Sequence, residues 1–199
     1  WIGTGEKGRR NSAGVGTGVY KSLDGGKNWQ HLGLELTGAI DSVLLHPSNP
    51  EVAYVGALGN TWTESPERGV YKTTDGGESW DKVLYVNETT GAGDLVMDPA
   101  SPNHLIAAMW DHRRWPWFFR SGGPGSGLYV TYDGGENWKQ LSTAEGLPSG
   151  ELGRMGLDFA RGNPKVVYAV VEATRSVMLR SDDRGDTWKV VNDKGAGRP

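Results

Sequence analysis

Apolar residues along this chain gather in short runs, and each run is bounded by clusters of Gly, Asp, Asn, Ser and Pro. Long runs rich in Ala, Leu, Glu and Lys, which helices favour, are absent. Many short strands separated by turn-forming residues are typical of β-sandwiches, barrels and propellers. The pattern therefore predicts an all-β protein.

Four pairs of these runs are joined by one eight-residue sequence, Ser/Thr-x-Asp-x-Gly-x-x-Trp, so each copy reads as a hairpin turn. The Asp and the hydroxyl can accept turn N–H groups, Gly supplies a positive φ, and Trp covers the turn with an apolar face. A catalytic Asp or a calcium loop is the alternative, but four near-identical copies favour a structural role. The structural residues are Asp24, Gly26, Trp29, Asp75, Gly77, Trp80, Asp133, Gly135, Trp138, Asp183, Gly185 and Trp188.

The four Trp residues are separated by 51, 58 and 50 residues, and a second block, strand, Pro-capped turn, strand, recurs upstream of the last three boxes. One repeat is thus four antiparallel strands, here A to D, which is the make-up of a propeller blade. We expect residues 1–199 to form a single propeller segment of about four blades, part of a ring or half of a larger propeller. The expected blades are 1–36 (strands B to D only), 37–91, 92–147 and 148–193, followed by a tail, 194–199. Self-association or missing blades would be needed to close the ring.

The boxes resemble the Asp-box (BNR) repeats of sialidases, xyloglucanase-type glycoside hydrolases, sortilin-type receptors and photosystem II assembly propellers. Four further segments look like bacterial sortilin-like (VPS10-type) propeller proteins, which are often labelled glycosyl hydrolases: 1–6, 18–22, 68–77 and 152–157. The resemblance implies the propeller fold over essentially the whole chain. It leaves the activity open, because Asp-boxes occur in enzymes and binding proteins alike.

Composition excludes several classes of function. A net charge of −3 gives no electrostatic footprint for nucleic acid, and no apolar run is long enough for a membrane span. With no cysteine and four scattered histidines, we expect neither a metal site nor a cofactor. The lack of cysteine fits a cytosolic or an exported protein, and our hypothesis is a secreted or periplasmic one.

A binding site is expected on the face formed by the B–C loops and the D–A connections, because that is where the repeats diverge. The segment 110–120 is a long insertion that no other blade has, and it interleaves Trp and Phe rings with Arg, Asp and His heads. Rings suit sugar faces or apolar peptide side chains, and Arg forks suit carboxylates. The leading hypothesis is an exported, non-catalytic module that binds a glycan or peptide. Its candidate residues are Arg9, Arg10, Trp62, Arg68, His112, Arg113, Arg114, Trp115, Trp117 and Arg175.

Two other functions stay open. A sialidase- or xyloglucanase-like glycoside hydrolase would place two carboxylates on the same face, and the candidates are Glu6, Glu64, Asp111 and Glu172. Nothing in the sequence pairs any two of them, so the catalytic residues are unknown. A structural or assembly scaffold is the third class.

Overall fold

The computed structural model describes residues 1–7 and 12–194. Its strands form four separate antiparallel sheets. The first sheet contains β1 (Ile2–Gly3), β2 (Val19–Lys21) and β3 (Gln30–His31), and the second contains β4 (Ile40–Leu45), β5 (Ala53–Ala57), β6 (Gly69–Thr73) and β7 (Asp81–Leu84). The third contains β8 (Thr90–Asp98), β9 (Ser101–Trp115), β10 (Phe118–Ser121), β11 (Gly127–Thr131) and β12 (Lys139–Gln140), and the fourth contains β13 (Met155–Phe159), β14 (Val167–Val171), β15 (Val177–Ser181) and β16 (Lys189–Asn192).

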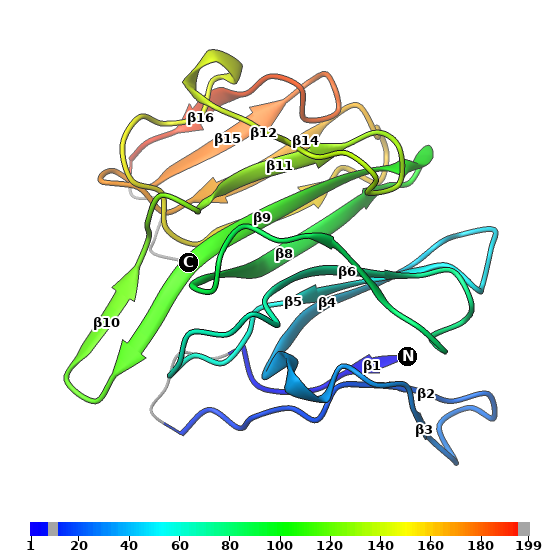
Figure 1. Cartoon of the computed structure of the whole chain (residues 1–199). Helices are drawn as coiled ribbons and strands as arrows, with labels where there is room; N and C mark the ends of the chain where they lie inside the picture. Colours follow the sequence, from blue (N-terminus) through cyan, green and yellow to red (C-terminus); the bar gives the residue numbers. More distant parts are fainter. Residues whose placement is uncertain (8–11, 195–199) are drawn as a thin grey trace.

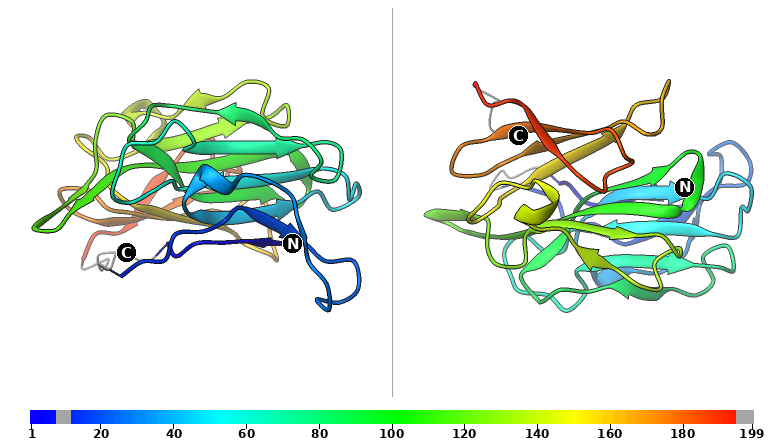
Figure 2. Two further views of the ribbon diagram at one scale, coloured as in Figure 1. Left: turned by 60° about the horizontal axis from the view of Figure 1, so that its bottom comes forward. Right: turned by 90° about the horizontal axis from the view of Figure 1, so that it is seen from above.

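The sheets are stacked in chain order as an open arc, from the first sheet at the bottom of Figure 1 to the fourth at the top. The first strands of successive blades, β4, β8 and β13, lie next to one another, so strand A is the inner strand of each blade. Figure 2 shows the same succession of sheets from two further directions. The prediction of an all-β partial propeller with four-stranded blades is confirmed, with three strands in the first blade and an additional strand, β10, in the third.

Hydrogen bonds inside each box explain its residues. In the second box, the Thr73 hydroxyl donates to Asp75 Oδ1 at 2.7 Å and accepts from the Gly77 N–H at 2.9 Å. The Asp75 carboxylate also accepts from the backbone and hydroxyl of Ser79. The box therefore closes on itself through short-range contacts, which is why the same residues recur at every C–D turn.

Apolar side chains fill the spaces between successive sheets rather than one central core. The boxes of the second and third blades also contact the blade before them: Lys21 Nζ donates to the Gly76 carbonyl at 3.2 Å, and Lys72 Nζ donates to the Gly134 carbonyl at 2.9 Å. These boxes thus form the turn within their own blade and also hydrogen-bond to the preceding blade.

The segment 110–120, expected as a loop, is instead a β-hairpin that prolongs strands B and C of the third blade. Trp115 pairs with Phe118, Arg113 pairs with Arg120, and Pro116 and Trp117 form the two-residue turn. The hairpin projects from the stack at the lower left of Figure 1. Two short 3₁₀ helices, η1 (Glu35–Thr37) and η2 (Thr143–Glu145), are the helices of the described chain, and neither is long and apolar enough to cross a membrane.

Candidate functional site

The projecting hairpin, residues 110–121, is called the arm below. Alternate residues of a strand point to opposite sides, so the arm has two chemically different faces. The inner face carries Trp110, His112, Arg114, Phe119 and Ser121, and the outer face carries Asp111, Arg113, Trp115, Phe118 and Arg120.

The inner face fastens the arm to the fourth blade. The fully buried Trp110 stacks on His112 with ring centroids 4.2 Å apart and donates from Nε1 to Ser121 Oγ at 3.1 Å. Ser121 Oγ then donates to Glu172 Oε2 at 2.5 Å, and the Arg154 N–H donates to the same oxygen at 2.9 Å. Glu172 therefore serves as a hydrogen-bond acceptor between blades.

Arg68, predicted as an exposed ligand-binding residue, is completely buried. Its guanidinium donates to the carbonyls of Thr89, Asn60 and Thr63 and contacts His112 Nδ1 at 3.1 Å. Burial lowers the pKa of Arg68 to about 10, opposed by the nearby Asp111 charge, so the group stays cationic at neutral pH. The loop backbone and His112 thus engage the guanidinium of Arg68, and ligand binding by this residue stays a prediction. His112 is also fully buried, between Arg68 and the Trp110 ring.

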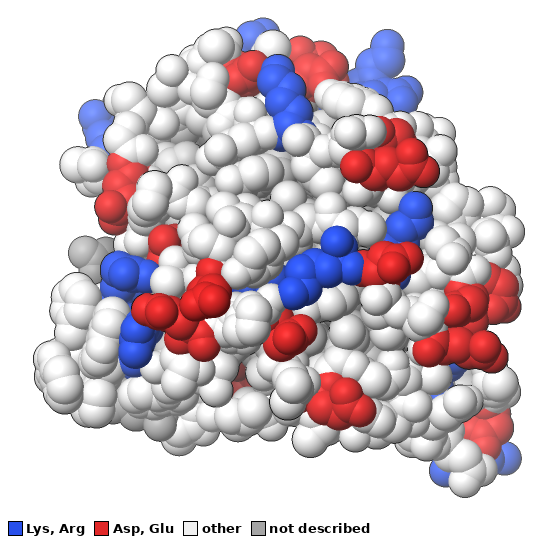
Figure 3. Space-filling model, in the orientation of Figure 1, with Lys and Arg blue, Asp and Glu red and all other residues white. Residues whose placement is uncertain are grey.

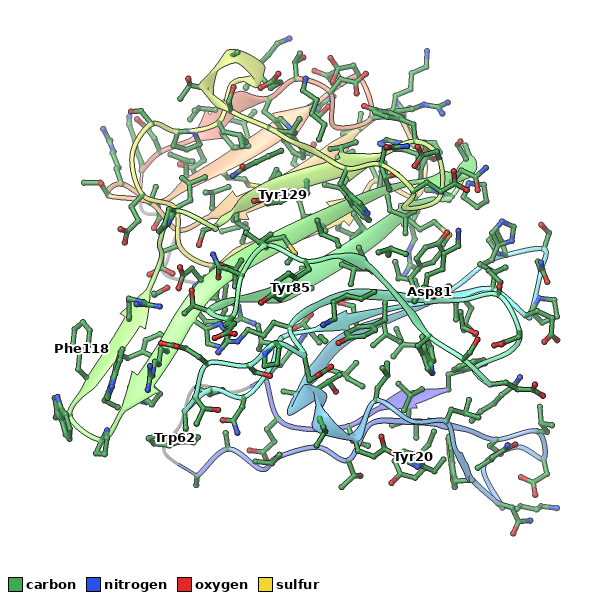
Figure 4. All side chains as sticks on the ribbon, viewed as in Figure 1. Tyr20, Trp62, Asp81, Tyr85, Phe118 and Tyr129 are labelled. Atoms are coloured by element: carbon green, nitrogen blue, oxygen red, sulfur yellow. The ribbon has the colours of Figure 1, made fainter. Side chains whose placement is uncertain are left out.

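The outer face combines ion pairs with exposed rings. Arg113 pairs with Glu64 Oε1 at 2.7 Å and lies over the Trp115 ring at 4.7 Å, and Arg120 pairs with Asp111 Oδ1 at 2.7 Å. Trp115 and Phe118 lie 6.0 Å apart, and the tip residue Trp117 is 82% exposed. Trp115, Trp117 and Phe118 line a shallow hollow of about 390 Å³. Figure 4 shows Phe118 at the outer edge of the arm.

A larger cavity of about 590 Å³ lies where the arm returns to its blade. Its wall includes Gly123, Pro124, Gln140, Ser142 and Glu151. Gly123 packs directly against the Asp111 carboxylate, where a side chain would collide with it. The cavity therefore adjoins the outer-face ion pair of Asp111 and Arg120.

The remaining predicted residues lie in different loops, and the loop of Trp62 bonds to the arm through the Arg114 N–H and the Thr61 carbonyl at 2.8 Å. Trp62 is half-buried in the loop between β5 and β6, and Arg175 pairs with Asp193 at 3.2 Å (Figure 4 labels Trp62). Arg114 lies over the Phe119 ring at 5.1 Å. Arg9 and Arg10 lie outside the described residues. Arg68 and Arg175 are thus each engaged by protein partners of their own.

The carboxylate candidates also separate. Glu64 and Asp111 share the outer side of the arm, whereas Glu172 is bonded through Ser121 to its inner side. Glu6 is exposed and accepts from the Gly14 N–H at 3.2 Å. Within residues 1–7 and 12–194, no group of three or more acidic, His or Cys residues is arranged to hold a metal ion. Lys and Arg alternate with Asp and Glu on the visible face in Figure 3.

The candidate residues did not include Arg120, Ser121 and Asn60, which organise this site, although Arg120 belongs to the segment 110–120. Arg120 and Ser121 stood at the end of the unusual segment, and its alternation of residues was the signal that could have placed them on opposite faces of a strand. Asn60 acts through its backbone carbonyl, for which side-chain chemistry carries no signal.

Four fan-like antiparallel sheets with a box at every C–D turn define a β-propeller segment. The family model described as "Sortilin, neurotensin receptor 3" matches residues 17–147, and the chain belongs to this Sortilin-Vps10 family. Among solved structures, the chain is similar to an ancestral GH74 enzyme (TM-score 0.64, 22% identity, 92% of this chain and 22% of that one). It is also similar to the GH74 enzyme of Niastella koreensis (TM-score 0.63, 18% identity, 86% of this chain and 26% of that one). The chain thus spans about a quarter of the length of these structures, and no curated protein matches it.

Proposed function

We propose that this propeller segment is an exported, non-catalytic module that binds a glycan on the outer face of the arm. The observation that carries the proposal is the arm itself, an ordered hairpin that holds Trp117 and Phe118 82% and 56% exposed. Large apolar side chains gathered at an exposed tip favour a binding role, because water contact is costly for them. Flat rings of this kind stack on the apolar faces of sugars.

The charges beside the rings favour a neutral, hydroxyl-rich ligand over an anion. Arg113 and Arg120 each have a carboxylate partner at 2.7 Å, so the outer face presents compensated pairs rather than an excess of positive charge. Paired donors and acceptors can exchange hydrogen bonds with hydroxyl groups without leaving a charge unmatched. A peptide is the second ligand class that the rings would accept.

The test is binding of neutral oligosaccharides and of uncharged aromatic-rich peptides by titration calorimetry. Trp117→Ala and Trp115→Ala should each weaken binding of the oligosaccharide at least tenfold, as expected for loss of one stacking ring, about 1.4 kcal/mol. Leu23→Ala is the matched control, because Leu23 is 86% exposed on a box turn. Unchanged affinity in both Trp variants would refute the proposal. Binding of peptides but of no oligosaccharide would show that the ligand is a peptide and not a glycan.

A glycoside hydrolase remains the second candidate, supported by the presence of Glu64 and Asp111 on one side of the arm. Hydrolysis needs an acid and a base or nucleophile flanking one bond. If the chain hydrolyses an oligosaccharide, Glu64→Gln and Asp111→Asn should abolish turnover while binding changes only a few fold. Glu136→Gln, at an exposed position of the third box, is the control variant for that assay.

A further inference from the structure

The cavity of about 590 Å³ at the base of the arm has the size of a ligand pocket. Pockets for small molecules typically measure roughly 300 to 1,000 Å³. All of the residues that line this cavity fall between 123 and 152, in the third blade and its connection to the fourth. The cavity is therefore enclosed by the middle of the chain and lies apart from both ends of the arc.

Two walls of the cavity are fixed by hydrogen bonds within the protein. On one side, the Gly122 N–H donates to the Asp111 carbonyl at 2.9 Å, and the Asp111 N–H donates to Ser126 Oγ at 2.9 Å. On the other side, Ser142 and Glu145 cap η2 reciprocally. A ligand thus meets a cavity that is already formed, which lowers the entropic cost of binding.

The floor of the cavity is apolar. Leu141, Leu147 and Leu152 line it, and all three are buried in the core between the third and fourth blades. Pro124 and Pro148 add further apolar surface at its edge. The body of a ligand in this cavity therefore contacts hydrocarbon, which favours an aliphatic group.

The charge of the cavity is negative. Glu151 is the one charged residue among the described residues that line it. Two other carboxylates nearby are already paired, Glu145 with Lys139 at 2.8 Å and Asp111 with Arg120 at 2.7 Å. Within residues 1–7 and 12–194, by contrast, Glu151 has neither an ion pair nor a hydrogen bond through its side chain. The cavity thus has an uncompensated carboxylate beside an apolar floor.

A second free acceptor lies beside this carboxylate. A Cβ at Gly122 would lie 2.7 Å from Glu151 Oε1 and 3.0 Å from the Leu152 carbonyl oxygen, so the glycine lets both oxygens approach the same loop. The Leu152 carbonyl accepts no hydrogen bond from the described part of the chain. Two neighbouring acceptors, one of them charged, suit a cation with several N–H donors, and a primary ammonium has three.

We propose that this cavity binds an aliphatic primary ammonium. The ammonium donates to the Glu151 carboxylate and the Leu152 carbonyl, and the alkyl part packs against Leu141 and Leu147. Such a group occurs in free alkylamines and at the N-terminus of a peptide whose first side chain is aliphatic. This inference is independent of the proposed glycan site, because the rings of the arm line a different hollow.

The first test is an NMR titration of the ¹⁵N-labelled chain at neutral pH with n-pentylamine, and with n-pentanol as the uncharged analogue. Pentylamine should bind more tightly than pentanol and shift the resonances of residues 140–152. Glu151→Gln should weaken pentylamine about fivefold and leave pentanol unchanged; the factor is modest because Glu151 is exposed. Glu78→Gln, at an exposed position of the second box, is the matched control. Equal affinities for pentylamine and pentanol, or equal effects of the two Gln variants, would overturn the proposal.

A blocking variant tests the position of the ligand independently of charge. Thr143→Trp introduces a large ring at an exposed residue of the lining and should weaken pentylamine and pentanol alike. Ala144→Trp, at the next exposed residue, which is not part of the lining, should weaken neither. Unchanged pentylamine affinity in Thr143→Trp would place the amine elsewhere and overturn the site.

A tripeptide distinguishes the two sources of the ammonium group. Leu-Gly-Gly amide should bind more tightly than its N-acetylated form, which lacks the charge. If the free tripeptide also binds more tightly than pentylamine, the natural ligand is a peptide N-terminus, and the reverse order indicates a free amine. Equal binding of the free and acetylated tripeptides would show that the ammonium is not recognised and would contradict the proposal.

Discussion

Arg184 has a backbone φ of 67° at a box position where the other three copies have glycine. A non-glycine residue in this left-handed region costs about 1 kcal/mol or more. Its side chain reaches back to the preceding blade and pairs with Asp98, which is fully buried and also contacts His104 at 3.4 Å. The strained backbone at Arg184 therefore places a cation beside the buried Asp98 carboxylate.

Arg184→Gly should lower the free energy of unfolding by about 0.5 kcal/mol, although it restores the residue of the other boxes. A hydrogen bond to a buried charge contributes roughly 1.5 to 3 kcal/mol, and the lower end applies here because the Arg184 guanidinium is half-exposed. Even this lower value exceeds the backbone strain that the glycine would relieve. Urea denaturation followed by tryptophan fluorescence measures the difference. Arg184→Lys keeps a cation and should lie between the two. A more stable glycine variant would contradict this account.

Residues with local chemistry were predictable from the sequence, and residues with long-range partners were not. The box residues bond within their own turn, so their roles followed from spacing alone. Arg68 and His112 carry the same functional groups as ligand-binding residues, but both are buried where Arg68 meets Thr89 and His112, which lie 21 and 44 residues further along the chain. The sequence next to Arg68 and His112 does not indicate these long-range contacts.

The box is also an acid-sensitive element. The Asn28 backbone N–H, with the side chains of Asn28 and Ser22, lowers the pKa of Asp24 to about 2. The Ser79 hydroxyl and N–H similarly hold the pKa of Asp75 below its usual range, and the Asn137 side chain and N–H do so for Asp133. In each case the folded turn favours the ionised carboxylate.

Stability should therefore fall as pH is lowered. A carboxylate with a depressed folded pKa contributes its stabilisation above the unfolded pKa near 4, and that contribution is lost as the pH falls toward about 2. Urea midpoints at pH 6, 4, 3 and 2.5 should decline mainly below 4. Asp24→Asn should reduce the slope, because Asn cannot lose a charge. A midpoint that stays constant from pH 5 to 2.5 would contradict the prediction.

At the level of elements, the arm was the main difference between expectation and structure. Gly- and Pro-containing sequence around residues 116–125 suggested a loop, but Pro116 occupies a two-residue turn between paired strands. The alternation of Trp110 and His112 with Asp111 and Arg113 was consistent with a strand. The alternation was hard to recognise because both faces of the hairpin carry aromatic and charged side chains, so neither face is purely apolar.

At the level of the whole molecule, the repeat period predicted the propeller because each blade buries its faces only against its neighbours. The period does not record how neighbouring blades are fastened. That depends on which side chains reach a box from the preceding sheet: Tyr54 and Lys72 donate to the Gly134 carbonyl, whereas Ile106 packs against Gly185 through an apolar contact.

Removing the hydrogen bonds between the second and third blades should loosen the arc without unfolding a blade. The double variant Tyr54→Phe, Lys72→Met deletes both donors to the Gly134 carbonyl and should cost about 1 to 2 kcal/mol, since net hydrogen bonds contribute roughly 0.5 to 1.5 kcal/mol each. Hydrogen exchange should quicken in residues 131–138 more than in residues 181–188. Equal changes in both boxes would indicate a global effect instead.

The paired strands of the arm also have a kinetic meaning. The rings are already held on a hydrogen-bonded hairpin. The arm therefore loses little conformational entropy when a ligand stacks on these rings. Related ligands should then associate at similar rates and differ chiefly in how long they stay bound. The arm would therefore distinguish between ligands mainly through their dissociation rates.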